Sequence, residues 1–120
     1  MVGLFYQPYN VQDAEWVVKA YFDRMYDDGR FFEAVSYIMR RYGFCVDGAY
    51  CNFPVLESLD VEDHFEGVEF SYGYPSRDDE IVVVSEAVCA NFLRLSCCAY
   101  VKRHPEDDLT VNSLLANLMF

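Results

Sequence analysis

Lysine and arginine are scarce in this chain of 120 residues: there are nine of them, against twenty aspartates and glutamates. The resulting net charge of −11 repels phosphate groups, so the composition argues against binding to nucleic acids or to anionic membrane surfaces. No apolar run approaches the roughly 18 residues of a membrane-spanning helix, and the first residues have no cationic flank typical of a secretion signal. We therefore expect a soluble acidic protein that attracts a basic partner.

Motifs for catalysis and for phosphate or metal binding are missing as well. The sequence contains no GxSxG, HExxH, GxxxxGK[ST] or GxGxxG element, so we expect no cofactor, no resident metal and no catalytic residues. The five cysteines form no CxxC pair, and three of them fall within an apolar helical pattern. This usage predicts reduced thiols and a cytoplasmic protein. A disulfide between Cys45 and Cys51 is the alternative.

Two weaker candidates for chemistry lie in one acidic segment. His64 stands between Asp63 and Glu66, and these carboxylates would favour its charged form. A small hydrolase built on His64 is therefore an alternative function, although no nucleophile or metal motif accompanies it. Asp60 and Glu62 add oxygen ligands of the kind that calcium prefers, without the pattern of an EF-hand loop. The simpler interpretation of both features is a solvated acidic loop.

Hydrophobic residues make up 53% of the chain, which is enough to build a core for one domain spanning residues 1–120. Apolar residues at spacings of three and four predict helices over 12–28 and 31–42. Each is followed by a glycine suited to a left-handed stop, Gly29 and Gly43. Helices joined by so short a connection should pack against each other.

The last third of the sequence is predicted to be helical again. Ser85 is a suitable cap for a helix that continues to about Arg103, with Leu95 on its inner side. Pro105 and the acidic residues after it then begin a fourth helix.

The middle of the chain has the two-residue period of strands. Asp47-Gly48 favours a tight turn between short runs at 44–46 and 49–53. Residues 67–74 alternate strictly, and residues 81–84 are all β-branched or aliphatic, which is typical of a central strand. We therefore predict an α+β fold in which about four helices cover one face of an antiparallel sheet of three or four strands.

Acidic residues gather in two clusters near the predicted strands. Six lie between Glu57 and Glu69 without any Lys or Arg, and a second cluster follows the strand 67–74. If the flanking strands pair, the clusters lie at either end of one hairpin and could join across a rim. They form either a solvated edge that prevents aggregation or a docking face for a basic protein, to which Tyr50, Tyr72 and Tyr74 could add contacts. The residues that we predict to bind the partner are Asp60, Glu62, Asp63, Glu66, Glu69, Asp78, Asp79 and Glu80.

Five segments carry a resemblance to a known family: Asp13–Asp23, Tyr42–Phe44, Asp47–Cys51, Glu62–Phe70 and Tyr100–Asp107. Together they resemble the immunity proteins of bacterial contact-dependent growth inhibition (CDI) systems, in particular the group paired with ribonuclease toxins. The resemblance implies a cytoplasmic protein without turnover of its own, which binds the C-terminal toxin domain of a surface exoprotein and blocks it. An acidic adaptor or regulatory subunit of another assembly is the alternative.

Overall fold

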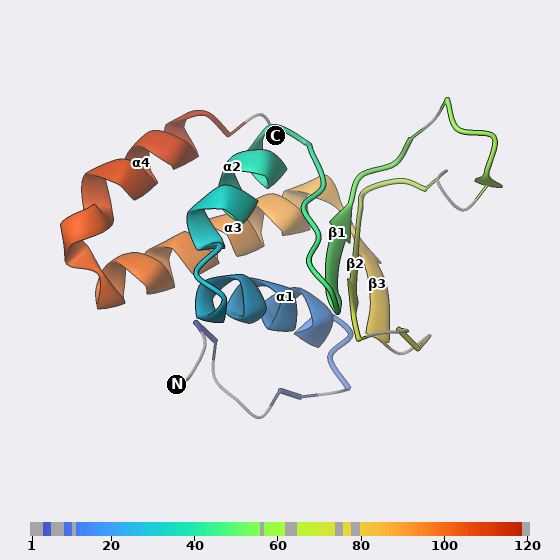
Figure 1. Ribbon diagram of the computed structural model, residues 1–120, viewed down its shortest axis with the longest axis horizontal. Coiled ribbons are helices and arrows are strands. Elements are labelled where there is room, and N and C mark those ends of the chain that lie inside the picture. The colour runs from blue at the N-terminus through green and yellow to red at the C-terminus, as the bar shows by residue number, and fades with distance from the viewer. Residues whose placement is uncertain are drawn as a thin grey trace.

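In the computed structural model, the described part of the chain folds into four α-helices that lie on one side of a three-stranded antiparallel sheet (Figure 1). The structure describes residues 4–5, 9–10, 12–55, 57–61, 65–73, 76–77 and 80–118. The predicted α+β class is confirmed. In chain order the elements are α1 (Trp16–Asp27), α2 (Phe31–Met39), β1 (Ala49–Asn52), β2 (Val68–Tyr72), β3 (Ile81–Val84), α3 (Glu86–Arg103), the 3-10 turn η3 (Pro105–Asp107) and α4 (Asp108–Ala116).

The strand order is β1-β2-β3, so β2 is central and both neighbours pair with it in antiparallel fashion. The prediction that residues 81–84 form a central strand is wrong, because β3 lies at the edge. Its side chains Ile81 and Val83 are 40% and 44% exposed. β-branched residues favour extended backbone, but this preference does not distinguish an edge strand from a central one.

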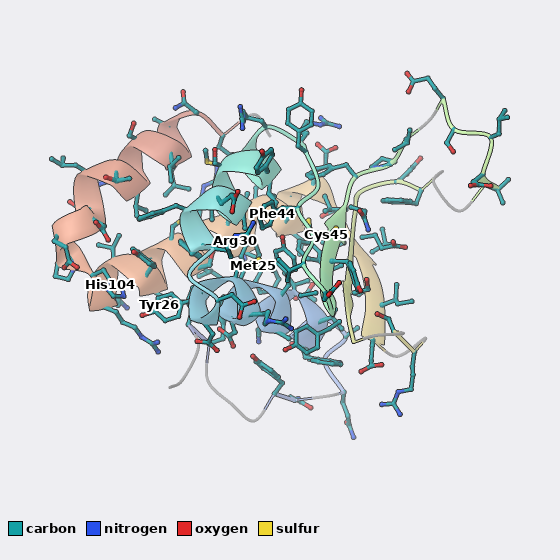
Figure 2. The ribbon with its side chains drawn as sticks, in the orientation of Figure 1. Met25, Tyr26, Arg30, Phe44, Cys45 and His104 are labelled. Carbon is teal, nitrogen blue, oxygen red and sulfur yellow. The ribbon has the colours of Figure 1, made fainter. Side chains whose placement is uncertain are left out.

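The Asp47-Gly48 turn forms as predicted, with Gly48 at φ +85° and reciprocal hydrogen bonds between Val46 and Ala49. The run before it is not a strand, however, since only Val46 forms a bridge. The Phe44 ring instead stacks on Tyr37 of α2 at 5.5 Å and lies beneath the Arg30 guanidinium at 5.1 Å (Figure 2). These contacts hold the segment against α2, while the Phe44 amide still donates a hydrogen bond to the Cys51 carbonyl of β1 at 3.1 Å.

The two N-terminal helices differ in how they stop. Gly29 follows α1 at φ +72°, as predicted. α2 ends at Met39, before the predicted boundary, because Arg41 rather than Gly43 adopts the left-handed conformation, with φ +65°. Arg41 is the left-handed residue of a Schellman motif, in which the Tyr42 amide donates to the Tyr37 carbonyl at 3.0 Å and the Arg41 amide donates to the Ile38 carbonyl at 2.9 Å. The Arg41 guanidinium also lies 2.6 Å from the Glu86 carboxylate of α3.

α1 forms the layer between the sheet and the other helices. Tyr21 and Phe22 on α1 contact Phe70 of β2, with ring centroids 5.3 and 6.0 Å apart. The Tyr21 hydroxyl donates a hydrogen bond to the Phe44 carbonyl at 2.6 Å, so this buried polar group is satisfied. Burial raises the pKa of Tyr21 far above its ordinary value.

α3 begins at the predicted cap, where the Ser85 hydroxyl accepts a hydrogen bond from the Val88 amide at 3.1 Å. Its inner face was predicted less well: Leu95 is exposed, whereas Ser96 and Cys97 are buried. Apolar and small residues lie on every side of this helix, so periodicity alone could not select the buried face. None of the helices in the described ranges is long and apolar enough to cross a membrane.

Asp23 on α1 is the only charged side chain that is buried among the described residues, at 2% exposure. Its carboxylate accepts hydrogen bonds from the Phe5 amide at 2.9 Å and from the Tyr9 hydroxyl. These bonds attach the N-terminal segment to α1. Burial raises the pKa of Asp23, and the two hydrogen bonds reduce that effect without cancelling it.

The raised pKa of Asp23 predicts a specific pH dependence of stability. Between the ordinary Asp value of 3.8 and the higher folded value, the folded state binds more protons than the unfolded state. The contribution of Asp23 to the free energy of unfolding is therefore lost as pH rises through this window. Urea denaturation should show that Asp23→Asn, which has no charge to bury, loses less free energy of unfolding than wild type as pH rises through this window. If both proteins lose the same stability over this window, Asp23 is not the group responsible.

Candidate functional site

Charge is divided unevenly between the sheet and the helices. Residues 42–85, which contain all three strands, carry ten Asp or Glu and one Arg, so they hold −9 of the total charge of −11. The rest of the chain has ten acidic and eight basic residues. The part of the chain that contains the sheet is thus strongly acidic, and the part that contains the helices is nearly neutral.

Two of the residues predicted to bind a partner, Asp60 and Glu66, are exposed in the segment that connects β1 to β2 and extends beyond the sheet (Figure 1). Within the described ranges, no basic side chain forms an ion pair with either of them. The same segment exposes two apolar side chains, Leu59 at 99% and Val61 at 78%. This segment therefore presents apolar and negatively charged side chains to solvent side by side.

Glu69 lies on β2 itself, paired across the sheet with Asn52 of β1 and Val83 of β3. Glu80 lies at the other end of β2, where its carboxylate accepts a hydrogen bond from the Arg77 amide at 2.9 Å and pairs with the Arg77 side chain at 3.3 Å. The described members of the two clusters are therefore at opposite ends of the sheet, with Glu69 between them. The other predicted residues lie outside the described ranges: Glu62, Asp63, Asp78 and Asp79.

The tyrosines predicted to assist binding fall on different sides of the sheet. Tyr50 is half-buried and points away from the helices, together with Asn52. Tyr72 packs edge-on against Trp16 near the start of α1, with ring centroids 6.4 Å apart, so it belongs to the helical side. Tyr74 and His64 lie outside the described residues. Of the two among these tyrosines that lie in the described residues, Tyr50 is the one placed to meet a partner at the sheet.

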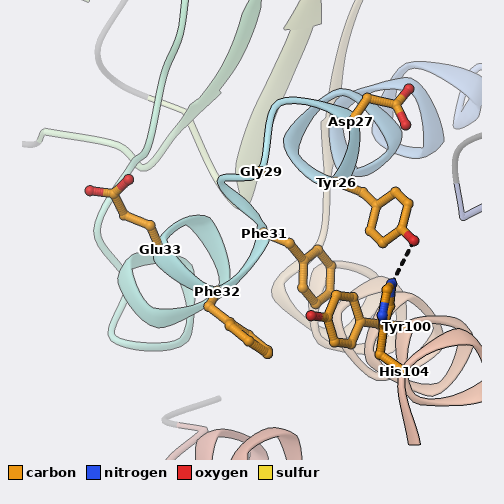
Figure 3. A pocket seen from close by; sticks show the side chains of 8 residues that line it. All are labelled: Tyr26, Asp27, Gly29, Phe31, Phe32, Glu33, Tyr100 and His104. Carbon is orange, nitrogen blue, oxygen red and sulfur yellow. Dashed lines mark hydrogen bonds between the residues drawn. The ribbon is translucent and has the colours of Figure 1, made fainter. Parts of the chain in front are cut away.

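An aromatic hollow of about 570 Å³ lies between the end of α1, the start of α2 and the end of α3 (Figure 3). Phe31 and Tyr100 stack in parallel at 4.9 Å, and the Tyr26 hydroxyl lies 2.7 Å from Nε2 of His104. No pattern in the sequence indicates this hollow, since its walls come from segments about 70 residues apart. It is lined by Tyr26, Asp27, Gly29, Phe31, Phe32, Glu33, Tyr100 and His104.

The described residues that line the hollow place no hydroxyl, thiol or amine nucleophile of Ser, Thr, Cys or Lys beside His104. Nδ1 of His104 lies 3.5 Å from the Glu106 carboxylate, so both ring nitrogens already have partners. None of the described residues that line the hollow is Ser, Thr, Cys or Lys, so His104 has none of these side chains to activate as a nucleophile. His104, Glu106 and Asp107 could together ligate a metal ion, but the Tyr100 hydroxyl already donates to Asp107 at 2.9 Å.

The five cysteines carry free thiols. Burial raises the pKa of Cys89 and of Cys97 to about 12 and that of Cys51 well above its ordinary value. Exposed Cys45 also has a raised pKa, mainly through partial burial of its sulfur. These four thiols stay protonated at neutral pH and are poor nucleophiles.

The chain was compared with known families and structures. The family model CdiI_4, described as CDI immunity protein, matches residues 14–115. The crystal structure of an immunity protein from Neisseria meningitidis MC58 matches with a TM-score of 0.70 and 14% identity, covering 92% of this chain and 99% of that chain. A search of curated proteins gave no match. The structural match shows a shared fold, and the family match includes every helix and strand apart from the last residue of α4. The chain therefore belongs to the CDI immunity protein family.

Proposed function

We propose that this protein binds and neutralises the ribonuclease toxin domain of a CDI exoprotein through the acidic end of its fold. The observation that carries the proposal is the charge of −9 held by residues 42–85. A ribonuclease must attract RNA, which is a polyanion, so its active face is expected to be basic. An acidic sheet end is complementary to such a face and would compete with RNA for it.

The exposed loop acids Asp60 and Glu66 are the described side chains best placed for this contact, because no described base neutralises them. Glu80 is engaged by Arg77 and would contribute mainly to the long-range field. Glu62 and Asp63 extend the same loop in sequence, and Glu69, Asp78 and Asp79 complete the proposed binding set. In this role the protein acts in the cytoplasm, where an incoming toxin domain meets RNA, and catalyses no reaction.

The test uses the C-terminal domain of the exoprotein encoded directly upstream of this gene. Changing Glu62, Asp63 and Glu66 to Lys together should slow association about 10- to 100-fold at low salt, because steering by the acidic loop is reversed. Raising the salt concentration should slow the wild-type association and narrow this difference. The measurement is stopped-flow binding across a series of salt concentrations.

A matched control reverses three exposed carboxylates at the helical end, Asp27, Glu106 and Asp108, and should leave association much closer to wild type. If the loop variant binds and protects cells as well as wild type, the acidic face is the wrong surface even though the immunity role stands. If the wild-type protein binds the toxin domain without inhibiting RNA cleavage in vitro, the ribonuclease assignment is wrong. The absence of an upstream toxin gene would favour the adaptor function instead.

A further inference from the structure

One face of the sheet has none of the described helices packed on it. The described helices lie on the face that carries Phe70 and Val68 (Figure 1). Because strand residues alternate between faces and paired residues share one, the register defines the opposite face. Its two rows of side chains are Tyr50–Ser71–Ile81 and Asn52–Glu69–Val83.

This outer sheet face, defined by those six residues, is apolar along its edge strand. Ile81 and Val83 both point outward from β3, while Val84 points inward and is buried. A solvent-facing sheet surface is normally polar, and edge strands commonly carry charged side chains that block association. Ile81 and Val83 are instead apolar and exposed on the edge strand β3. Tyr50, on the other edge strand β1, adds an aromatic ring.

We propose that the outer sheet face is the centre of the toxin-binding surface, where Tyr50, Ile81 and Val83 supply apolar area beside Glu69, and that the acidic residues around the face form its rim. This inference rests on the function proposed above. The loop that carries Asp60 and Glu66 lies at one end of the strands, and Glu80 lies at the other. An apolar centre within a charged rim is the usual organisation of protein interfaces.

The charge of this region selects a basic protein as the occupant rather than a second copy of the chain. Two copies joined through the outer sheet face would bring together two regions that each carry −9. Like charges facing each other across an interface oppose association, whereas a cationic domain would be attracted.

The size of the face shows that the loop must take part. Strands of four, five and four residues give a face of roughly 15 by 10 Å. A stable interface needs about 800 Å² from each partner, so the sheet face alone is too small. The exposed Leu59 and Val61 lie on the adjoining loop and supply further apolar area. The apolar groups are then expected to control the rate of dissociation, and the acidic groups are expected to control the rate of association.

A binding experiment separates these two contributions. The double variant Ile81→Thr/Val83→Thr keeps both β-branched shapes and removes apolar surface from the outer sheet face. It should dissociate from the purified toxin domain about 30-fold faster, with association changed less than about 3-fold, at low and at high salt. The matched control Leu95→Gln/Leu109→Gln removes exposed apolar side chains from α3 and α4 and should leave both rates near wild type.

A second experiment uses the wild-type protein, so it does not depend on how the variant folds. The chain has two isoleucines, Ile38 in the core and Ile81 on the outer sheet face. With labelled isoleucine methyl groups, a soluble paramagnetic probe should broaden the Ile81 signal in the free protein and not in the complex. The Ile38 signal should be protected in both states and serves as the internal reference.

Several results would overturn the inference. Unchanged dissociation of the threonine variant, or an Ile81 methyl that stays accessible in the complex, would place the contact elsewhere. Sedimentation that shows a wild-type dimer lost in the threonine variant would assign the face to self-association. In each case the proposed function stands if the wild-type protein still blocks RNA cleavage, and it fails if the wild-type protein does not bind the toxin domain at all.

Discussion

Replacing Phe70 by alanine is expected to lower the free energy of unfolding by about 3–5 kcal/mol, the range for deleting a buried phenylalanine ring. Phe70 is fully buried on the central strand, and its ring contacts both Tyr21 and Phe22 of α1. The ring therefore joins the sheet to the helical layer. Without it, a cavity would remain between α1 and β2, because the backbone on both sides is fixed by regular hydrogen bonds.

Urea denaturation followed by circular dichroism measures this loss. Phe70→Leu should cost considerably less, since most of the apolar volume remains. Leu109→Ala, at an exposed position on α4, should change the free energy of unfolding by no more than about 0.5 kcal/mol. A loss below about 1 kcal/mol for Phe70→Ala would mean that the sheet and α1 do not depend on this contact.

The features that the sequence predicted well depend on neighbouring residues. The Ser85 cap, the Gly29 stop and the Asp47-Gly48 turn each need only a few adjacent positions to form. The end of α2 was predicted wrongly because the left-handed residue that closes it is Arg41, and residues with side chains rarely adopt this conformation. Glycine is the usual signal for such a stop, and the nearest glycine in the sequence is Gly43, two positions later, so the predicted boundary was too late.

The two candidate surfaces, the acidic region and the outer sheet face, differ in whether the sequence alone reveals them. The acidic character of residues 42–85 is a property of composition, so it could be recognised without a fold. The outer sheet face could not, because it exists only when Glu69 pairs with both Asn52 and Val83. The sequence indicated Ile81 and Val83 as buried residues of a central strand, and only the strand order places them at an exposed edge.

Changing Gly67 to alanine is expected to destabilise the protein by about 3–4 kcal/mol, combining backbone strain with a steric clash. Gly67 has φ +103°, a conformation that residues with side chains rarely adopt. A β-carbon there would lie 2.1 Å from the Val84 carbonyl oxygen. Because that oxygen belongs to the backbone at the Val68–Val84 pair, the two strands would have to separate.

Gly29→Ala is the matched control. Gly29 also has a positive φ, +72°, but a β-carbon there would have no atom within 4 Å. Its cost should be limited to the left-handed backbone, about 1–2 kcal/mol. The difference between the two variants in urea denaturation isolates the close approach of Gly67 to Val84. Equal losses would show that this approach does not determine stability. A larger loss of stability for Gly67→Ala than for Gly29→Ala would mean that the β2–β3 pairing depends on a glycine next to the acidic loop. The same residue would then fix the position of both the outer sheet face and the loop.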